Sequence, residues 1–123
     1  MPQFSGKCKG EGMENLQVTI ETGKLQGIHG WDPRIAVFKG IPYAAPPVGE
    51  LRWRAPQPAA GWEGVRMVDQ YGPIACQPVP GSNPREFWTR EIHPTGPEFE
   101  MSEDCLYLNV YTPARTGEEK LPV

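Results

Sequence analysis

The residues able to act as a nucleophile or a general base are few and widely spaced in this sequence. A hydroxyl nucleophile needs a neighbouring base and a backbone that holds it in a strained or positively polarised position. The serines are Ser5, Ser82 and Ser102, and the histidines are His29 and His93. None of these serines lies in Gly-x-Ser-x-Gly, whose glycines permit the tight turn that exposes a nucleophile. We therefore predict that no catalytic residue lies in this chain, and we interpret both histidines as exposed loop residues.

Metal and cofactor sites are not indicated either. Cys8, Cys76 and Cys105 lie far apart, and neither Cys-x-x-Cys nor His-x-x-x-His occurs. The glycine-rich stretch GKCKGEG matches neither the dinucleotide-binding pattern nor the phosphate-binding loop. We expect no metal and no cofactor.

Two pairs of residues could instead stabilise the structure. A disulfide between Cys76 and Cys105 would close a loop of about 29 residues and stabilise the fold by roughly 3–4 kcal/mol, less any strain. A reducing cytoplasm would not preserve such a bond. Arg52 could pair with Glu103 or Asp104, which would tie a proline-rich stretch to the segment before a strand.

The elements that would position these pairs are predicted to be short strands. Alternating apolar residues predict a hairpin around Glu21–Lys24, with further strands at Ile35–Ile41 and Val65–Tyr71. Cys105–Pro113 is the clearest strand, and its two apolar faces indicate a place inside a larger sheet. Another strand is expected to begin at Leu121, and no helix is predicted.

Irregular segments separate these strands. The stretch from Phe38 to Pro58, FKGIPYAAPPVGELRWRAPQP, contains five prolines and excludes a long helix. From Gly72 to Met101 the sequence has little periodicity, and a loop of this length in a compact domain is expected only where it is functional or pinned.

Composition and charge exclude some partners. The 14 glycines and 15 prolines, beside four each of Trp, Tyr and Phe, indicate an ordered but loop-rich chain. The net charge of -3 argues against a nucleic-acid partner. Six carboxylates and two arginines lie between Gln77 and Asp104. This segment is either a solvated acidic loop or an acidic rim that attracts cationic ligands.

Residues 1–15 are predicted to form a flexible leader, and residues 16–123 the folded part. No apolar run approaches the roughly 20 residues of a membrane span, so no membrane partner is expected. The leader MPQFSGKCKGEGMEN also lacks the apolar stretch of a secretory signal. If Met1 is the natural start, a cytoplasmic location is expected, and secretion is the alternative if upstream sequence is missing.

Two longer segments resemble a known family. Phe38–Arg52, FKGIPYAAPPVGELR, followed by prolines and Trp62, is similar to the amino-terminal signature of the type-B carboxylesterase and cholinesterase family. Ser102–Val110, SEDCLYLNV, is similar to the second signature of that family. The segments lie in the expected order, and the resemblance extends from Val18 to Val123.

The resemblance implies an α/β-hydrolase fold, of which this chain is the amino-terminal portion. This portion is expected to be mostly β, with a small antiparallel sheet, the first strands of the main sheet and long irregular loops. The resemblance also implies a disulfide between Cys76 and Cys105, in an oxidising compartment, and a buried salt bridge between Arg52 and Glu103. An aromatic residue of the intervening loop would line the active-site gorge, unless these aromatics simply pack beneath the loop; the candidates are Phe87, Trp88 and Phe99.

The implied function is hydrolysis of a small carboxylic ester by a longer parent protein. In that family the His-Gly-Gly-Gly of the oxyanion hole follows a segment like Lys120–Val123, and the nucleophile, acid and histidine come later. The resemblance therefore implies that this chain alone is inactive. A fragment of a non-catalytic binding or adhesion protein of the same family is the alternative. In either case the proline-rich stretch is interpreted as a brace that lets Arg52 reach Glu103.

Overall fold

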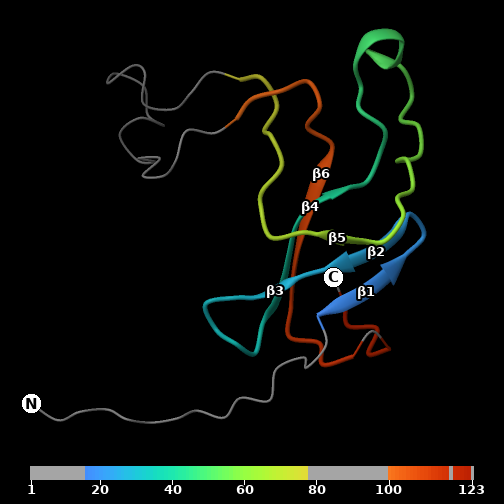
Figure 1. Ribbon diagram of the computed structural model, residues 1–123. Coiled ribbons are helices and arrows are strands. Elements are labelled where there is room, and N and C mark those ends of the chain that lie inside the picture. Colours follow the sequence, from blue (N-terminus) through green and yellow to red (C-terminus); the bar gives the residue numbers. More distant parts are fainter. Residues whose placement is uncertain (1–15, 78–99, 117, 123) are drawn as a thin grey trace, which may run out of the picture. The chain divides into compact units, whose positions relative to one another are not determined.

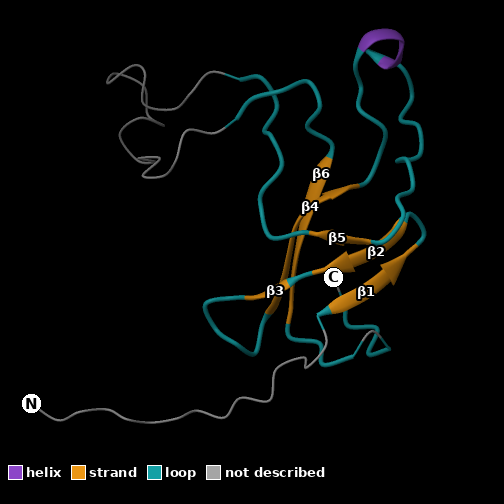
Figure 2. Ribbon diagram, in the orientation of Figure 1, coloured by secondary structure: helices purple, strands orange, loops and turns teal. Residues whose placement is uncertain are grey.

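The computed structural model describes residues 16–77, 100–116 and 118–122. These residues form six short strands, β1 to β6, and one 3-10 helix, η1 (Figure 1). Loops and turns connect the strands over most of the described length (Figure 2). The described residues divide into two compact units. The first unit contains those up to Ile41, Gly61–Tyr71 and those from Leu108 onward, and the second contains Pro42–Ala60 and those within Gly72–Tyr107.

A hairpin begins the first unit. β1 (Gln17–Ile20) pairs antiparallel with β2 (Gly23–Gln26), and Val18 lies opposite Leu25. β5 (Val65–Met67) pairs with the other side of β2 in the parallel direction. β2 is therefore the central strand of this sheet, and its Leu25 is among the most buried side chains of the described chain.

The second sheet has β4 at its centre. β4 (Ala36–Pro42) lies between β3 (Ile28–His29) and β6 (Tyr107–Thr112). β3 and β4 are antiparallel, with Ile28 opposite Val37. Most apolar residues of β4 are buried, as expected for a strand that has a neighbour on each side.

Gly40 interrupts the regular alternation of β4. Its φ of +67° lies in the left-handed region, which glycine adopts without steric cost. Phe38 and Ile41 belong to the same core although they are three residues apart, whereas a regular strand would direct them to opposite faces. The Gly40 N–H donates to Asn109 Oδ1 on β6 at 3.0 Å. A side chain of the neighbouring strand thus satisfies the donor at this irregular position.

The core of the first unit combines residues of both sheets. Its buried members are Leu25, Ala36, Phe38, Ile41 and Val68. Partly buried apolar residues pack against them: Leu16, Val18, Trp62 and Ala114. Gly27 permits this packing, because a Cβ at this position would lie 2.7 Å from the Phe38 ring. The Trp62 indole is fixed by a hydrogen bond from Nε1 to the Lys24 carbonyl at 2.9 Å.

The predicted hairpin is confirmed, as are the strands predicted at Ile35–Ile41, where β4 continues to Pro42, at Val65–Tyr71 and at Cys105–Pro113. The strand predicted at Val65–Tyr71 is shorter in the structure, since β5 ends at Met67. Beyond it, single hydrogen bonds replace the regular pairing: Val68 N donates to Gln26 O at 3.0 Å, and Lys39 N donates to Val68 O at 2.7 Å.

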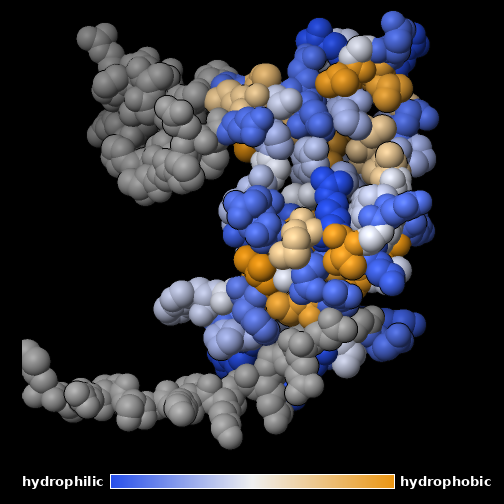
Figure 3. All heavy atoms as spheres, in the orientation of Figure 1, coloured by the Kyte–Doolittle hydropathy of each residue, from blue (hydrophilic) through white to orange (hydrophobic). Residues whose placement is uncertain are grey.

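Other predictions differ from the structure. The strand predicted from Leu121 is wrong for the described residues, which are irregular there, and Lys120 before it has a left-handed φ of +45° that interrupts extended backbone. The proline-rich stretch contains the short η1 (Gly49–Leu51), which the sequence pattern does not predict. β6 lies at one end of the described sheet rather than inside it, and its Val110 is partly exposed. Apolar side chains reach the surface at several places in the described part of the chain (Figure 3).

Candidate functional site

The serine and the histidine among the described residues, Ser102 and His29, both form local hydrogen bonds to the backbone. Ser102 Oγ accepts a hydrogen bond from the Asp104 N–H at 3.0 Å. His29 lies in strand β3 and not in a loop, so that part of the prediction is wrong, and its Nδ1 is 3.0 Å from the Pro33 carbonyl. Because a carbonyl only accepts, Nδ1 carries the proton of this bond. Ser102 and His29 are therefore not hydrogen-bonded to each other. Ser5, Ser82 and His93 lie outside the described residues.

An ion pair of the second unit joins Arg52 to Glu103. Arg52 Nη2 lies 2.6 Å from Glu103 Oε1. The side chains are 54% and 45% exposed, so the buried bridge implied by the family resemblance is a half-exposed ion pair in this structure. The Arg52 guanidinium also lies 5.6 Å from the ring centroid of Trp53, a residue that is 90% exposed.

The turn that carries Arg52 is built from backbone hydrogen bonds. Leu51 N donates to Val48 O at 3.0 Å, and Arg52 N donates to Gly49 O at 3.2 Å. Gly49 begins this turn with a φ of +55°. The η1 turn, together with the flanking prolines, therefore sets the direction of the Arg52 side chain.

The ends of segment 77–100 are held together close to Glu103. Ile74 forms an isolated parallel bridge with Met101. Ile74 N donates to Glu100 O at 2.9 Å, and Ser102 N donates to Ile74 O at 3.0 Å. These bonds place the chain on either side of this segment together, which is the pinning expected for a long segment without periodicity in its sequence.

Residues 102–107 complete this anchor. The Tyr107 hydroxyl donates to Asp104 Oδ2 at 3.2 Å. The Tyr107 ring packs so closely on Gly72 that a Cβ there would lie 2.6 Å from the ring. Within the second unit, the residues before and after segment 77–100 thus contact each other through both backbone and side chains. We call the Arg52–Glu103 pair and the Ile74–Met101 bridge together the loop anchor.

The proline-rich stretch is attached to the same region. Tyr43 N donates to Leu106 O at 3.2 Å, and Ala45 N donates to Gln57 O at 2.9 Å. The first bond joins the start of the stretch to the residues just before β6. The second joins its two arms, so that the stretch folds back on itself around η1.

The predicted disulfide is not formed in the structure. Cys76 is an exposed free thiol, and Cys105 is a half-buried free thiol. The bridge stays a prediction for an oxidised chain. The candidate gorge-lining aromatics Phe87, Trp88 and Phe99 all lie outside the described residues, as does Cys8.

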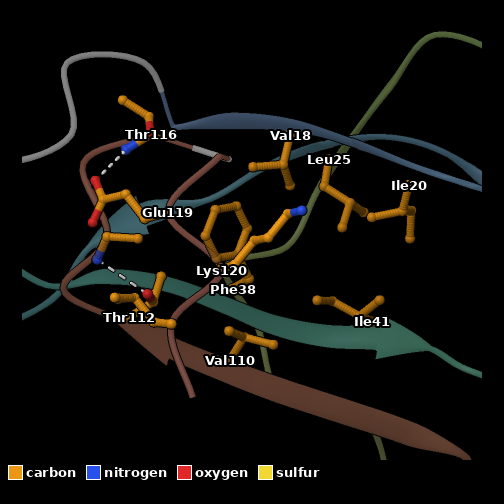
Figure 4. Close-up of a pocket in the computed structure, with 12 residues that line it drawn as sticks. Val18, Ile20, Leu25, Phe38, Ile41, Val110, Thr112, Thr116, Glu119 and Lys120 are labelled. Atoms are coloured by element: carbon orange, nitrogen blue, oxygen red, sulfur yellow. Dashed lines mark hydrogen bonds between the residues drawn. The ribbon is translucent and has the colours of Figure 1, made fainter. Parts of the chain in front are cut away.

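The first unit contains an apolar pocket of about 320 Å³. Its walls come from β1, β2, β4 and β6 and from the segment after β6. Figure 4 shows the Lys120 side chain extending beside Phe38 in this pocket, while Glu119 accepts a hydrogen bond from the Thr116 N–H at its edge. The lining includes no serine, cysteine or histidine, so this pocket can accept an apolar group but holds no nucleophile.

Neither a metal site nor a membrane span is found among these residues. No group of three or more His, Cys, Asp or Glu side chains in the described ranges could hold a metal ion. No helix of the described chain is long and apolar enough to cross a membrane.

Solved structures with the same local fold include esterases of the α/β-hydrolase class. A PNB esterase matches 88% of this chain with a TM-score of 0.67 and 37% sequence identity, and the match covers 20% of that protein. A Geobacillus stearothermophilus carboxylesterase matches 84% of this chain with a TM-score of 0.63 and 36% identity, over 17% of its own length. These matches confirm the predicted fold class.

The chain belongs to the carboxylesterase family, which residues 14–123 match. It is 52% identical to the phenmedipham hydrolase of Pseudarthrobacter oxydans over 82 residues, or 66% of this chain. It is 44% identical to the liver carboxylesterase of Sus scrofa over 106 residues, or 82% of this chain. The family predicted from the two signature segments is confirmed. The chain spans only a small part of the curated relatives that it matches, 15% of the first and 18% of the second.

Proposed function

We propose that this chain is the amino-terminal portion of a longer carboxylic ester hydrolase, in which it forms a structural frame beside the active site. The loop anchor carries this proposal: Arg52 and Glu103 pair at 2.6 Å beside the Ile74–Met101 bridge. A segment whose two ends are fixed in this way can present side chains to a neighbouring site while its root stays rigid. The fold shared with PNB esterase supports the same role.

The proposed reaction is hydrolysis of a small carboxylic ester. A serine hydroxyl, deprotonated by a histidine, attacks the carbonyl carbon, and backbone N–H groups stabilise the oxyanion that forms. The alcohol leaves, and water then releases the acid. We expect these groups in the remainder of the protein, because Ser102 and His29 both form local hydrogen bonds to the backbone and not to each other.

The relatives favour catalysis over the alternative of a binding protein without activity. Phenmedipham hydrolase, liver carboxylesterase and PNB esterase are all named for hydrolysis. The gene sequence after codon 123 distinguishes the two functions. His-Gly-Gly-Gly followed by Gly-x-Ser-x-Gly supports the esterase, and loss of either motif supports the binding protein.

An assay of the chain by itself tests the assignment of its serines. With a p-nitrophenyl ester as substrate, residues 1–123 should show no turnover above the buffer rate. Turnover that is abolished by Ser102→Ala or Ser82→Ala would contradict the frame role. Circular dichroism of Ser102→Ala serves as the control for folding.

A further inference from the structure

Two exposed tyrosines of the first unit lie in direct contact. The Tyr71 and Tyr111 hydroxyl oxygens are 2.6 Å apart. Tyr71 follows β5, whereas Tyr111 belongs to β6, so the contact joins two elements that are distant in sequence. The residues are 62% and 54% exposed, and reagents in solution can therefore reach both rings.

This tyrosine pair is held in place from a second side. Lys39 Nζ lies 4.4 Å from the centroid of the Tyr71 ring, a distance at which the ammonium attracts the ring face. Lys39 is itself anchored, since its N–H donates to the Val68 carbonyl at 2.7 Å. The hydrogen bond to Tyr71 raises the pKa of Tyr111 above its ordinary value.

We propose that Tyr71 and Tyr111 form a site of oxidative cross-linking, in which a covalent bond joins the two rings. The modification is separate from ester hydrolysis and does not depend on the proposed function. Its substrate is the tyrosine pair itself, and the co-reactant is an external one-electron oxidant such as a peroxidase supplied with hydrogen peroxide.

The cross-link forms by oxidative coupling of two phenols. Each tyrosine loses one electron to the oxidant and one proton to water, which leaves two phenoxyl radicals. Each radical is shared with the ring carbons next to the oxygen, and coupling at two such carbons forms one carbon–carbon bond. The two ring hydrogens then move to the oxygens and restore the phenols. Hydrogen peroxide takes up the two electrons and two protons and becomes two waters.

The geometry favours this pair over the other tyrosines. Holding two reactive groups side by side replaces an encounter in solution with a reaction inside one molecule, which raises the effective concentration by orders of magnitude. Tyr43 is 54% exposed, as Tyr111 is, but its hydroxyl has no hydrogen-bond partner in the described part of the chain. The Tyr107 hydroxyl donates to Asp104 instead. Tyr43 is thus the matched control for an exposed tyrosine whose hydroxyl is not bonded to a second tyrosine.

A covalent bond between Tyr71 and Tyr111 would stabilise the folded chain. It would join the segment after β5 to β6 and close a loop in the unfolded chain, as a disulfide does. The cross-linked chain should therefore unfold at a higher denaturant concentration than the untreated chain.

The experiment treats the dilute chain with peroxidase and hydrogen peroxide and measures dityrosine fluorescence in the monomer fraction. Mass spectrometry with peptide fragmentation then maps the joined residues. We expect a monomer that has lost two hydrogen atoms, with Tyr71 joined to Tyr111. Tyr71→Phe and Tyr111→Phe should each lower the intramolecular yield at least about tenfold, and Tyr43→Phe should leave it unchanged. Bonds that involve Tyr43 or Tyr107 as often as the pair, or bonds only between molecules, would overturn the proposal. Because the map is made on the unmutated chain, it decides the question even if a variant fails to fold.

Discussion

Arg52 and Glu103 form an ion pair across the second unit, with Nη2 and Oε1 2.6 Å apart and both side chains about half exposed. Together with the Ile74–Met101 bridge it fixes the root of segment 77–100. Because solvent screens an ion pair of this exposure, the pair contributes little to the free energy of unfolding. Its main role is to define where the segment begins and ends.

A double-mutant cycle with Arg52→Ala and Glu103→Ala measures this ion pair. We expect a coupling free energy of about 0.2–1 kcal/mol in chemical unfolding of the chain, because exposed pairs contribute in that range. The coupling should fall in high salt. Loss of a buried partner costs roughly 3–5 kcal/mol, and an effect of that size for either single variant would show that the half-exposed geometry is wrong.

Gly72→Ala should destabilise the second unit. The added Cβ would lie 2.6 Å from the Tyr107 ring and 2.9 Å from its Cβ, so rotation of the ring alone cannot relieve the contact. We expect a loss of about 1–3 kcal/mol in the free energy of unfolding, as for other overpacked sites. Gly30→Ala is the control, since its closest contact would be 3.1 Å, to a Val37 methyl group. Equal effects of the two substitutions would contradict close packing of Gly72 on Tyr107.

Asn109→Ala should weaken the contact between β4 and β6. The buried Gly40 N–H would lose its acceptor, and an unsatisfied donor of this kind costs on the order of 1 kcal/mol or more. Asn109→Asp keeps a side-chain oxygen at the same position and should retain most of the stability. Hydrogen exchange of the Gly40 amide provides a local measurement. Unchanged protection in Asn109→Ala would rule out this hydrogen bond.

Asp32 should titrate well below an ordinary aspartate. Hydrogen bonds from the Arg34 side chain, followed by one from its backbone N–H, lower the pKa of Asp32 from 3.8 to about 2. Because the pKa is lower in the folded chain, the stabilisation is present above the unfolded value and is lost as the pH falls from about 4 to 2. NMR titration of the Asp32 carboxyl carbon measures the value directly. Arg34→Ala should move it back towards 3.8, and a pKa near 3.8 in the unmutated chain would refute the contact.

The sequence predicted correctly those features that depend on the residue types within one short segment. Alternating apolar residues predicted the hairpin and β4, and the two signature segments predicted the fold class, which the esterase structures confirm. The Arg52–Glu103 pairing came from the family resemblance rather than from spacing, since nothing in the local sequence excludes Asp104 as the partner.

Other features depend on contacts between distant residues. The left-handed φ of Gly40 brings Phe38 and Ile41 into one core, which a period of two residues cannot predict. The exposure of the Arg52–Glu103 pair depends on how the surrounding chain packs, and the sequence-based expectation of burial was wrong for this structure. The Tyr71–Tyr111 contact arises because β6 and the chain after β5 meet in the first unit, and no local pattern indicates it.

We propose, above all, that this chain frames the active site of a longer ester hydrolase without supplying the reacting groups. The most direct measurement compares p-nitrophenyl ester hydrolysis by the complete gene product and by residues 1–123 under the same conditions. We predict that the complete protein hydrolyses the ester, that a serine-reactive phosphonate stops it, and that the shorter chain shows no turnover. An inert complete protein, or an active shorter chain, would contradict the claim.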